Sequence, residues 1–178
     1  MATWNSRGLR GSGLEDLINY TIDTYREKKL ALIQKIPTPI TPIQIDKESR
    51  HITLAYFDKK STVDYIGVVQ GVPICFDAKE CAADTFPLAN IHEHQAAFMK
   101  DFERQGGIAF IIIQYTKRDE TYYLPCDRML EFCERSQTEN GRKSFGYDEL
   151  DKSFIIGREG AAPVHFLPAL QKDLARRD

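Results

Sequence analysis

The stretch IAFIIIQY at residues 108–115 restricts the fold of this 178-residue chain more than any other segment. Its apolar side chains do not alternate with polar ones, so a strand formed here must be covered on both faces. Strands of this kind lie in sheets that carry helices on both sides. The chain is therefore expected to form an α/β domain around a central sheet, and its length suits a single domain over residues 1–178.

Three segments have the spacing of amphipathic helices. An S-x-x-E capping box at Ser12 and Glu15 precedes leucine and isoleucine at helical intervals, which predicts a helix over residues 14–28. A second helix is expected within HEHQAAFMKDFERQG, residues 92–106, and a last one within HFLPALQKDLARR, residues 165–177.

Two hairpins are predicted from β-rich runs that flank turn residues. Residues 65–69 and 72–79 lie on either side of the dipeptide Gln-Gly at 70–71. Residues 43–45 and 52–57 lie on either side of the polar run DKESR, after a proline-interrupted stretch. The second hairpin is expected to project from the core.

The charge distribution excludes a uniformly basic nucleic-acid coat, because the net charge is −2. Residues 1–60 carry a charge of +3 and residues 61–178 a charge of −5. Binding to DNA would therefore need a local basic face, built largely from the first third, while clustered carboxylates in the remainder suit a divalent metal.

The sequence contains no recognisable targeting signal, so a cytoplasmic location is expected. No apolar run is long enough to cross a membrane, and the N-terminal segment lacks the apolar core of a secretory signal. The four cysteines contain no C-x-x-C pair, which favours free thiols in a reducing compartment.

The residues with the strongest chemical pattern are Asp64, Asp77 and Lys79. Residues two apart on a strand share a face, so Asp77 and Lys79 should lie side by side. Pairing of the two strands around Gln-Gly would bring Asp64 towards Asp77. Two carboxylates on one face form a hard-oxygen site for Mg²⁺, and a neighbouring lysine can stabilise charge on a phosphate. This set is the equipment for metal-assisted phosphodiester hydrolysis.

Two competing interpretations apply to these polar residues. An acid–lysine pair on a strand is more often a solvated surface pair, although Ile74 and Phe76 on the opposite face should pack into the core. His92 and His94, beside Glu93, have the wrong spacing to bind zinc from one helix face, so capping and DNA-facing roles are favoured.

The chain resembles the RecU family of Holliday junction resolvases, in the PD-(D/E)xK nuclease superfamily. The resemblance lies in STVDYIGVVQGVPICFDAKE and FPLANIHEHQ, and continues through KIPTP, GIAFIII and GRKSF. It implies a PD-(D/E)xK nuclease-like fold, with a central mixed sheet flanked by helices and a β-hairpin stalk at about residues 43–60. The family usually has glutamate where this chain has Asp77, which leaves metal distance and preference open.

The resemblance also implies roles for individual residues. Lys79 would stabilise the transition state, and Glu15 would be an acid that faces the metal or supports its ligands. The implied metal ligands are Thr62, Asp64, Asp77 and Gln95. The candidate DNA-binding residues are Arg7, Arg10, Lys47, Arg50, Tyr56, Phe57, Arg142 and Lys143. The alternatives for these eight DNA-binding candidates are mobile termini, solvated loops and packing of the aromatics on a neighbouring strand.

The implied activity is a Mg²⁺-dependent endonuclease, with Mn²⁺ as a substitute, that resolves four-way junctions by symmetric nicks during recombination and repair. Family members act as homodimers, and recombinases or branch-migration proteins are the expected further partners, with no membrane involved. A nucleoid-associated, cytoplasmic location is expected. Two alternatives stay open: a restriction-like nuclease acting on duplex DNA, and a DNA-bridging or recombinase-modulating module without catalytic activity.

Overall fold

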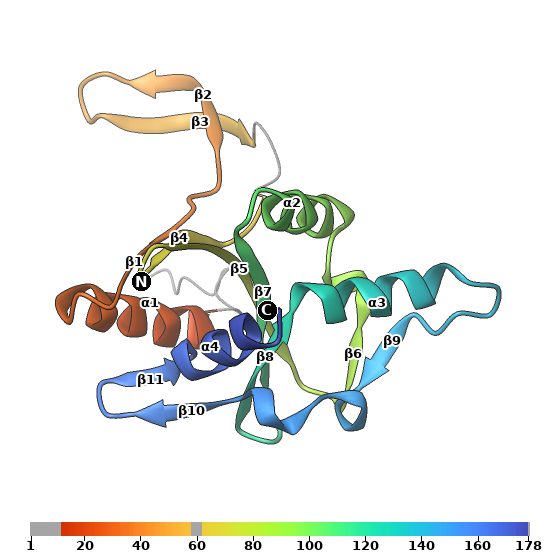
Figure 1. The fold of residues 1–178 in the computed structure, drawn as a ribbon. Helices are drawn as coiled ribbons and strands as arrows, with labels where there is room; N and C mark the ends of the chain where they lie inside the picture. The colour runs from red at the N-terminus through yellow and green to blue at the C-terminus, as the bar shows by residue number, and fades with distance from the viewer. Residues whose placement is uncertain (1–11, 58–61, 178) are drawn as a thin grey trace.

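A computed structural model describes residues 12–57 and 62–177 of the chain, apart from the side chain of Ser12 (Figure 1). The α-helices are α1 (Ser12–Glu27), α2 (Glu93–Arg104), α3 (Cys126–Gln137) and α4 (Leu167–Ala175), and three short 3₁₀ turns are η2 (Leu88–Asn90), η3 (Tyr147–Glu149) and η4 (Lys152–Phe154). The strands are β1 (Ala31–Lys35), β2 (Ile40–Asp46), β3 (His51–Phe57), β4 (Tyr65–Val69), β5 (Val72–Cys81), β6 (Thr85–Pro87), β7 (Ile108–Tyr115), β8 (Glu120–Pro125), β9 (Ser144–Gly146), β10 (Ile155–Glu159) and β11 (Ala162–His165).

The central sheet has seven strands in the order β1-β4-β5-β7-β8-β10-β11. Strands β5 and β7 run parallel, whereas their outer neighbours pair antiparallel. The parallel pair requires a crossover connection, and α2 lies in that connection. The expected class, a mixed sheet flanked by helices, is confirmed.

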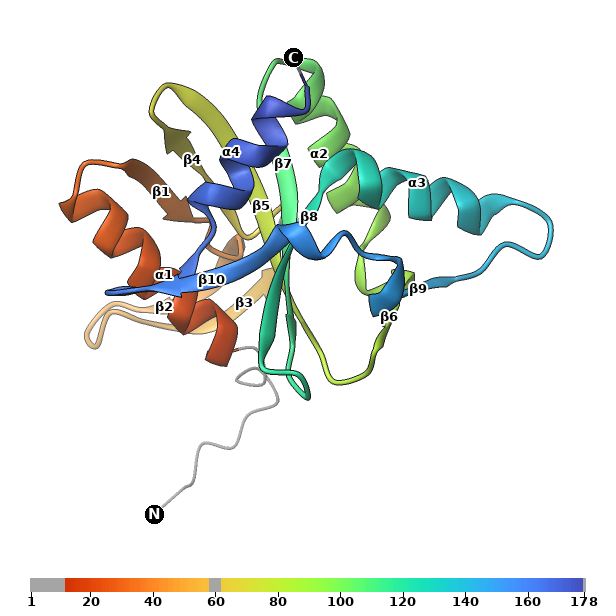
Figure 2. The same cartoon turned by 60° about the horizontal axis from the view of Figure 1, so that its bottom comes forward.

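The two faces of the sheet are covered by different helices (Figure 2). On the side of α1 and α4, the ring of Phe76 stacks on Phe110 at 4.8 Å between centroids and contacts Phe166 at the start of α4. On the side of α2, Ile111 of β7 and Met99 of α2 are fully buried. The central strand β7 is therefore buried on both faces, as its continuous apolar sequence predicts.

The hairpin of β2 and β3 stands away from the main sheet and forms a two-stranded sheet of its own (Figure 1). Its polar turn at residues 47–50 lies where the sequence places it. The hairpin begins at Ile40, three residues earlier than expected, because Pro42 is accommodated beside a bulge in the pairing of β2 with β3. Residues 58–60 of the expected stalk lie outside the described residues.

Two strand pairs were not predicted. Strand β6 pairs with β9, where Phe86 stacks on Phe145 at 5.1 Å, and β10 pairs with β11 around Gly160, whose φ is +50°. Both pairs involve short strands, and short runs give weak periodicity. Over the described part of the chain, no helix has the length and apolar character needed to cross a membrane.

Candidate active site

Asp77 and Lys79 lie on the same face of β5, as their spacing predicts. The Asp77 side chain is only 1% exposed, and Lys79 Nζ forms an ion pair with its Oδ2 atom, at 19% exposure. Ile74 and Phe76 are fully buried on the opposite face of the strand. The pair therefore joins a buried carboxylate to a partly exposed ammonium group, and the interpretation as a solvated surface pair is wrong.

Asp64 lies immediately before β4 and reaches Asp77 through the register of the β4–β5 hairpin. Tyr65 pairs with Phe76, which places Asp64 opposite Asp77 at the end of the ladder. The backbone N–H of Asp64 donates to Asp77 Oδ1 at 3.1 Å, and Asp64 Oδ2 accepts the N–H of Ala78 at 2.9 Å. The predicted juxtaposition of the two carboxylates is confirmed.

The turn that sets this register is held from outside the hairpin. Gln70 and Gly71 both have positive φ, at 48° and 90°, as a two-residue hairpin turn requires. The side-chain amide of Gln70 donates to the carbonyl oxygens of Lys29 and Leu30, each at 3.0 Å. These bonds stabilise a left-handed conformation that glutamine does not favour by itself.

The electrostatics of the pair suit a divalent cation. Burial and, after it, the negative charge of Asp64 raise the pKa of Asp77 to about 7, although the ammonium group of Lys79 opposes the increase. Two carboxylates that repel each other in a buried site are stabilised in their charged form by a cation between them. The donor set is of the hard-oxygen type that Mg²⁺ accepts, with water completing its coordination.

Gln95, near the start of α2, contacts the same carboxylate. Its Nε2 atom donates to Asp77 Oδ1 at 3.1 Å and to Oδ2 at 3.0 Å, and its Oε1 atom accepts the backbone N–H of His92 at 3.2 Å. The bond to His92 is half of a capping box at the start of the helix. In this arrangement Gln95 orients Asp77, and binding of a metal through its oxygen would need the opposite orientation of the amide.

Thr62 and Glu15 occupy different surroundings. Thr62 is half-buried and lines a shallow hollow with His92, Glu93 and His94, beside the start of α2. Glu15 lies on α1, where its carboxylate bonds Lys35 Nζ at 2.6 Å. No group of three or more His, Cys, Asp or Glu side chains suited to a metal occurs within 12–57 and 62–177.

The candidate DNA-binding residues of the hairpin are exposed. Lys47 and Arg50 lie in its turn, and Tyr56 and Phe57 near its base are 51% and 76% exposed. In the single chain, therefore, neither ring is buried against the neighbouring strand. Their alternation directs the two rings to opposite faces of β3.

Arg142 and Lys143, two further candidate DNA-binding residues, do not lie near the hairpin (Figures 1 and 2). The loop between α3 and β9 carries Arg142 and Lys143 and lies far from the hairpin in both views (Figures 1 and 2). Arg142 bonds Glu149 at 3.3 Å, and Lys143 Nζ donates to the carbonyl oxygen of Ser136. Arg7 and Arg10 lie outside the described residues.

The sequence did not predict the role of Glu80, next to Lys79. Its Oε1 atom accepts the backbone N–H of Leu14 at 3.0 Å and so caps α1 from β5. The expected capping residue, Ser12, has a side chain outside those described. A carboxylate that follows the D-x-K pattern and faces away from it was the available signal.

Comparison with known proteins identifies the family. The family model described as RecU, Recombination protein U, matches residues 9–172. A protein named Holliday junction resolvase RecU from Leuconostoc mesenteroides is 43% identical over 94% of this chain and 83% of its own length. The proteins of that name from Oenococcus oeni and Listeria welshimeri are 39% and 42% identical, over 93% of this chain and 86% and 84% of their own lengths.

A solved structure of Archaeoglobus fulgidus Hjc, a Holliday junction resolvase, aligns with a TM-score of 0.41 and 9% identity over 74% of this chain and 88% of that chain. The identification rests instead on the family match and on relatives that align over nearly the whole chain. The resemblance begins near Arg7-Gly8, just before the matched residues, and its catalytic block with Asp64, Asp77 and Lys79 lies inside them. The chain belongs to the RecU family.

Proposed function

We propose that this chain is a structure-specific endonuclease that resolves Holliday junctions in recombination and repair, acting as one domain over residues 1–178. The observation that carries the proposal is the cluster of Asp64, Asp77, Lys79 and Gln95, joined by hydrogen bonds and an ion pair on one face of the sheet. The curated relatives named Holliday junction resolvase support the substrate class.

The residues that would hold a divalent metal are Asp64 and Asp77, with Thr62 and Gln95 as the further candidates. Mg²⁺, or Mn²⁺ in its place, would supply Lewis acidity at the scissile phosphate and lower the pKa of an attacking water. The side chains fit such an ion, because burial and mutual repulsion disfavour two uncompensated carboxylates.

Lys79 would stabilise negative charge on the phosphate oxygens. Its ammonium group is held beside the carboxylate of Asp77 but stays 19% exposed, so a substrate can reach it. A fixed cation at this position needs little reorganisation when charge develops on the phosphate. Gln95 keeps both oxygens of Asp77 in one orientation throughout.

The hairpin supports a homodimer that makes paired nicks. Seven large apolar residues on it are between 47% and 76% exposed: Ile40, Ile43, Ile45, Ile52, Leu54, Tyr56 and Phe57. An isolated two-stranded hairpin is marginally stable, and apolar patches of this size mark contact surfaces. Pairing with a second copy would cover part of this surface and leave Lys47 and Arg50 at the tip for DNA.

The dimer is tested by sedimentation at micromolar concentration. The double variant Ile52→Lys, Leu54→Lys should shift the protein to monomer, whereas Ile155→Lys, on β10 of the main sheet, should not. A monomeric wild-type protein would refute the paired-nick part of the proposal.

The first test of function is cleavage of a labelled mobile four-way junction with Mg²⁺ or EDTA, beside linear duplex. Metal-dependent nicks at symmetric positions in the junction are expected, and Asp77→Asn should abolish them while junction binding persists. Cutting of linear duplex would favour a restriction-like nuclease. Tight junction binding without cutting would favour a bridging module.

A further inference from the structure

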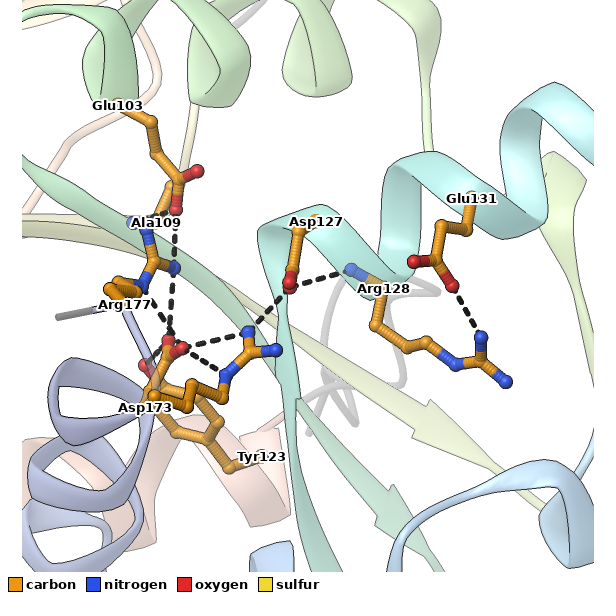
Figure 3. A network of polar contacts seen from close by, with 9 residues as sticks. Glu103, Ala109, Tyr123, Asp127, Arg128, Glu131, Asp173 and Arg177 are labelled. Carbon is orange, nitrogen blue, oxygen red and sulfur yellow. Dashed lines mark hydrogen bonds and ion pairs between the residues drawn. The ribbon is translucent and has the colours of Figure 1, made fainter.

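A network of polar side chains at the C-terminal end of α4 connects it with three other elements (Figure 3). Its centre is Asp173, which is fully buried. Tyr123 of β8 donates to Asp173 Oδ2 at 2.8 Å, and the side chains of Arg176 and Arg177 donate to Asp173 Oδ1 at 2.8 and 3.1 Å. The two arginines then reach in different directions.

Arg176 connects α4 with α3, and Arg177 connects α4 with α2. The Nη2 atom of Arg176 bonds Asp127 Oδ1 at 2.5 Å. The Nη2 atom of Arg177 bonds Glu103 Oε1 at 2.8 Å, and the same oxygen accepts the backbone N–H of Ala109 at 3.1 Å. The Arg177–Glu103 pair therefore joins helices from opposite faces of the sheet at the start of β7.

Glu103 lies on the same helix as Gln95, eight positions further along, which corresponds to about 12 Å. Gln95 bonds the N-terminal part of α2 to Asp77 of β5, and Glu103 bonds its C-terminal end to β7, the parallel neighbour of β5. Between these contacts Met99 is completely buried. The helix is therefore attached to the sheet at both ends, and weakening the attachment at Glu103 leaves its placement to Gln95 and Met99.

We propose that Arg177 is a positioning residue for the nuclease site. Through Glu103 it fixes the placement of α2, and α2 in turn fixes the amide of Gln95 against Asp77. The inference rests on the proposed nuclease function. Arg177 lies beyond residues 9–172, the part that the family model matches, so the contact extends past the matched region.

The test compares Arg177→Ala with Arg176→Ala, a matched variant in the same network that lacks the contact to α2. Both variants should lower the unfolding temperature. Arg177→Ala should also lower single-turnover cleavage of a four-way junction by about tenfold or more, because small displacements of catalytic groups are costly. Arg176→Ala should stay within about twofold of the wild type, as should junction binding by both.

A double-mutant cycle with Gln95→Ala separates positioning from general destabilisation. If Arg177 acts through Gln95, then Arg177→Ala should have little further effect on cleavage in the Gln95→Ala background. Binding of Ca²⁺ to the DNA-free protein, followed by thermal shift, should weaken in Arg177→Ala and not in Arg176→Ala. Arg177→Lys should recover part of the lost rate, because it keeps the charge.

Equal cleavage by the two alanine variants, or additive effects with Gln95→Ala, would overturn the inference. If Arg177→Ala does not fold, Arg177→Gln and Arg176→Gln take the same places in the comparison. A wild-type protein that cuts no junction would instead refute the proposed function, so the two failures are distinct.

Discussion

The side-chain amide nitrogen of Gln95 donates to both carboxylate oxygens of Asp77, at 3.1 and 3.0 Å. The contact fixes the rotation of the carboxylate. Because Gln95 also caps its own helix through His92, the orientation of the carboxylate depends on where α2 begins. The same residue thus serves the fold and the candidate site.

Gln95→Ala should reduce cleavage of a four-way junction by roughly 10- to 100-fold, the usual cost of removing a group that orients a metal ligand. Junction binding in EDTA should be unchanged. Single-turnover kinetics at saturating enzyme measure the effect. Gln105→Ala, an exposed glutamine just past the same helix, is the control and should cut normally. Equal rates for the two variants would contradict the assigned role of Gln95.

Lys79→Ala should lower cleavage by roughly 100- to 1,000-fold through loss of a fixed positive charge at the phosphate. The same change should raise the pKa of Asp77 further, because Lys79 at present opposes the increase. Cleavage rates and an NMR titration of the carboxylate measure the two effects. Lys100→Ala, on the exposed side of α2, should alter neither. Wild-type cleavage by Lys79→Ala would remove Lys79 from the mechanism.

The metal-free protein should lose stability as the pH rises from about 4 to 7. Folding raises the pKa of Asp77 from 3.8 to about 7, so in this interval the folded state binds more protons than the unfolded state. The free energy of unfolding then falls by up to about 1.4 kcal/mol per pH unit. Asp77→Asn lacks this titration. In EDTA, the difference between its melting temperature and that of the wild type should therefore shift in favour of the variant as the pH rises towards 8.

Asp101→Asn is the control for this profile, since its side chain is largely exposed on α2. Its melting temperature should follow that of the wild type at each pH. Parallel curves for Asp77→Asn and the wild type would show that Asp77 titrates normally.

Gly67→Ala should destabilise the sheet by about 1–3 kcal/mol, the cost of inserting a methyl group into a filled space. A Cβ atom on Gly67 would lie 2.3 Å from the carbonyl oxygen of Leu32 and 2.6 Å from Ile33 Cα, both on the backbone of β1. Gly157→Ala, on β10, has no atom within 4 Å of the new carbon and should be nearly neutral. Urea unfolding of both variants measures the difference, and equal stability would refute the close approach.

The placement of the acidic pair could be predicted from the sequence because it depends on one hairpin only. Asp64 and Asp77 belong to one hairpin, and alternation along the strand together with a two-residue turn places them. The burial of β7 could also be predicted, because it follows from the continuous apolar sequence of the strand itself.

The contacts that the sequence did not reveal join distant segments. Glu80 caps α1 across 66 positions, and the stacking of Phe86 on Phe145 joins two short strands. Charged residues show the same limit, since the contacts of Arg142 with Glu149 and of Lys143 with Ser136 could not be predicted from the turn sequence. Long-range partners of this kind are set by tertiary packing and leave no periodic signal.

The two-residue turn at Gln70 and Gly71 determines more than a change of strand direction. A slip of one residue in the pairing of β4 with β5 would turn Asp77 towards α1 and present Phe76 or Ala78 to α2. The residues of the proposed site therefore come together only when the sheet has formed in the correct register. The acidic pair forms only in a chain whose strands are correctly paired. Molecules with mispaired strands would therefore leave DNA uncut and would not cut it non-specifically.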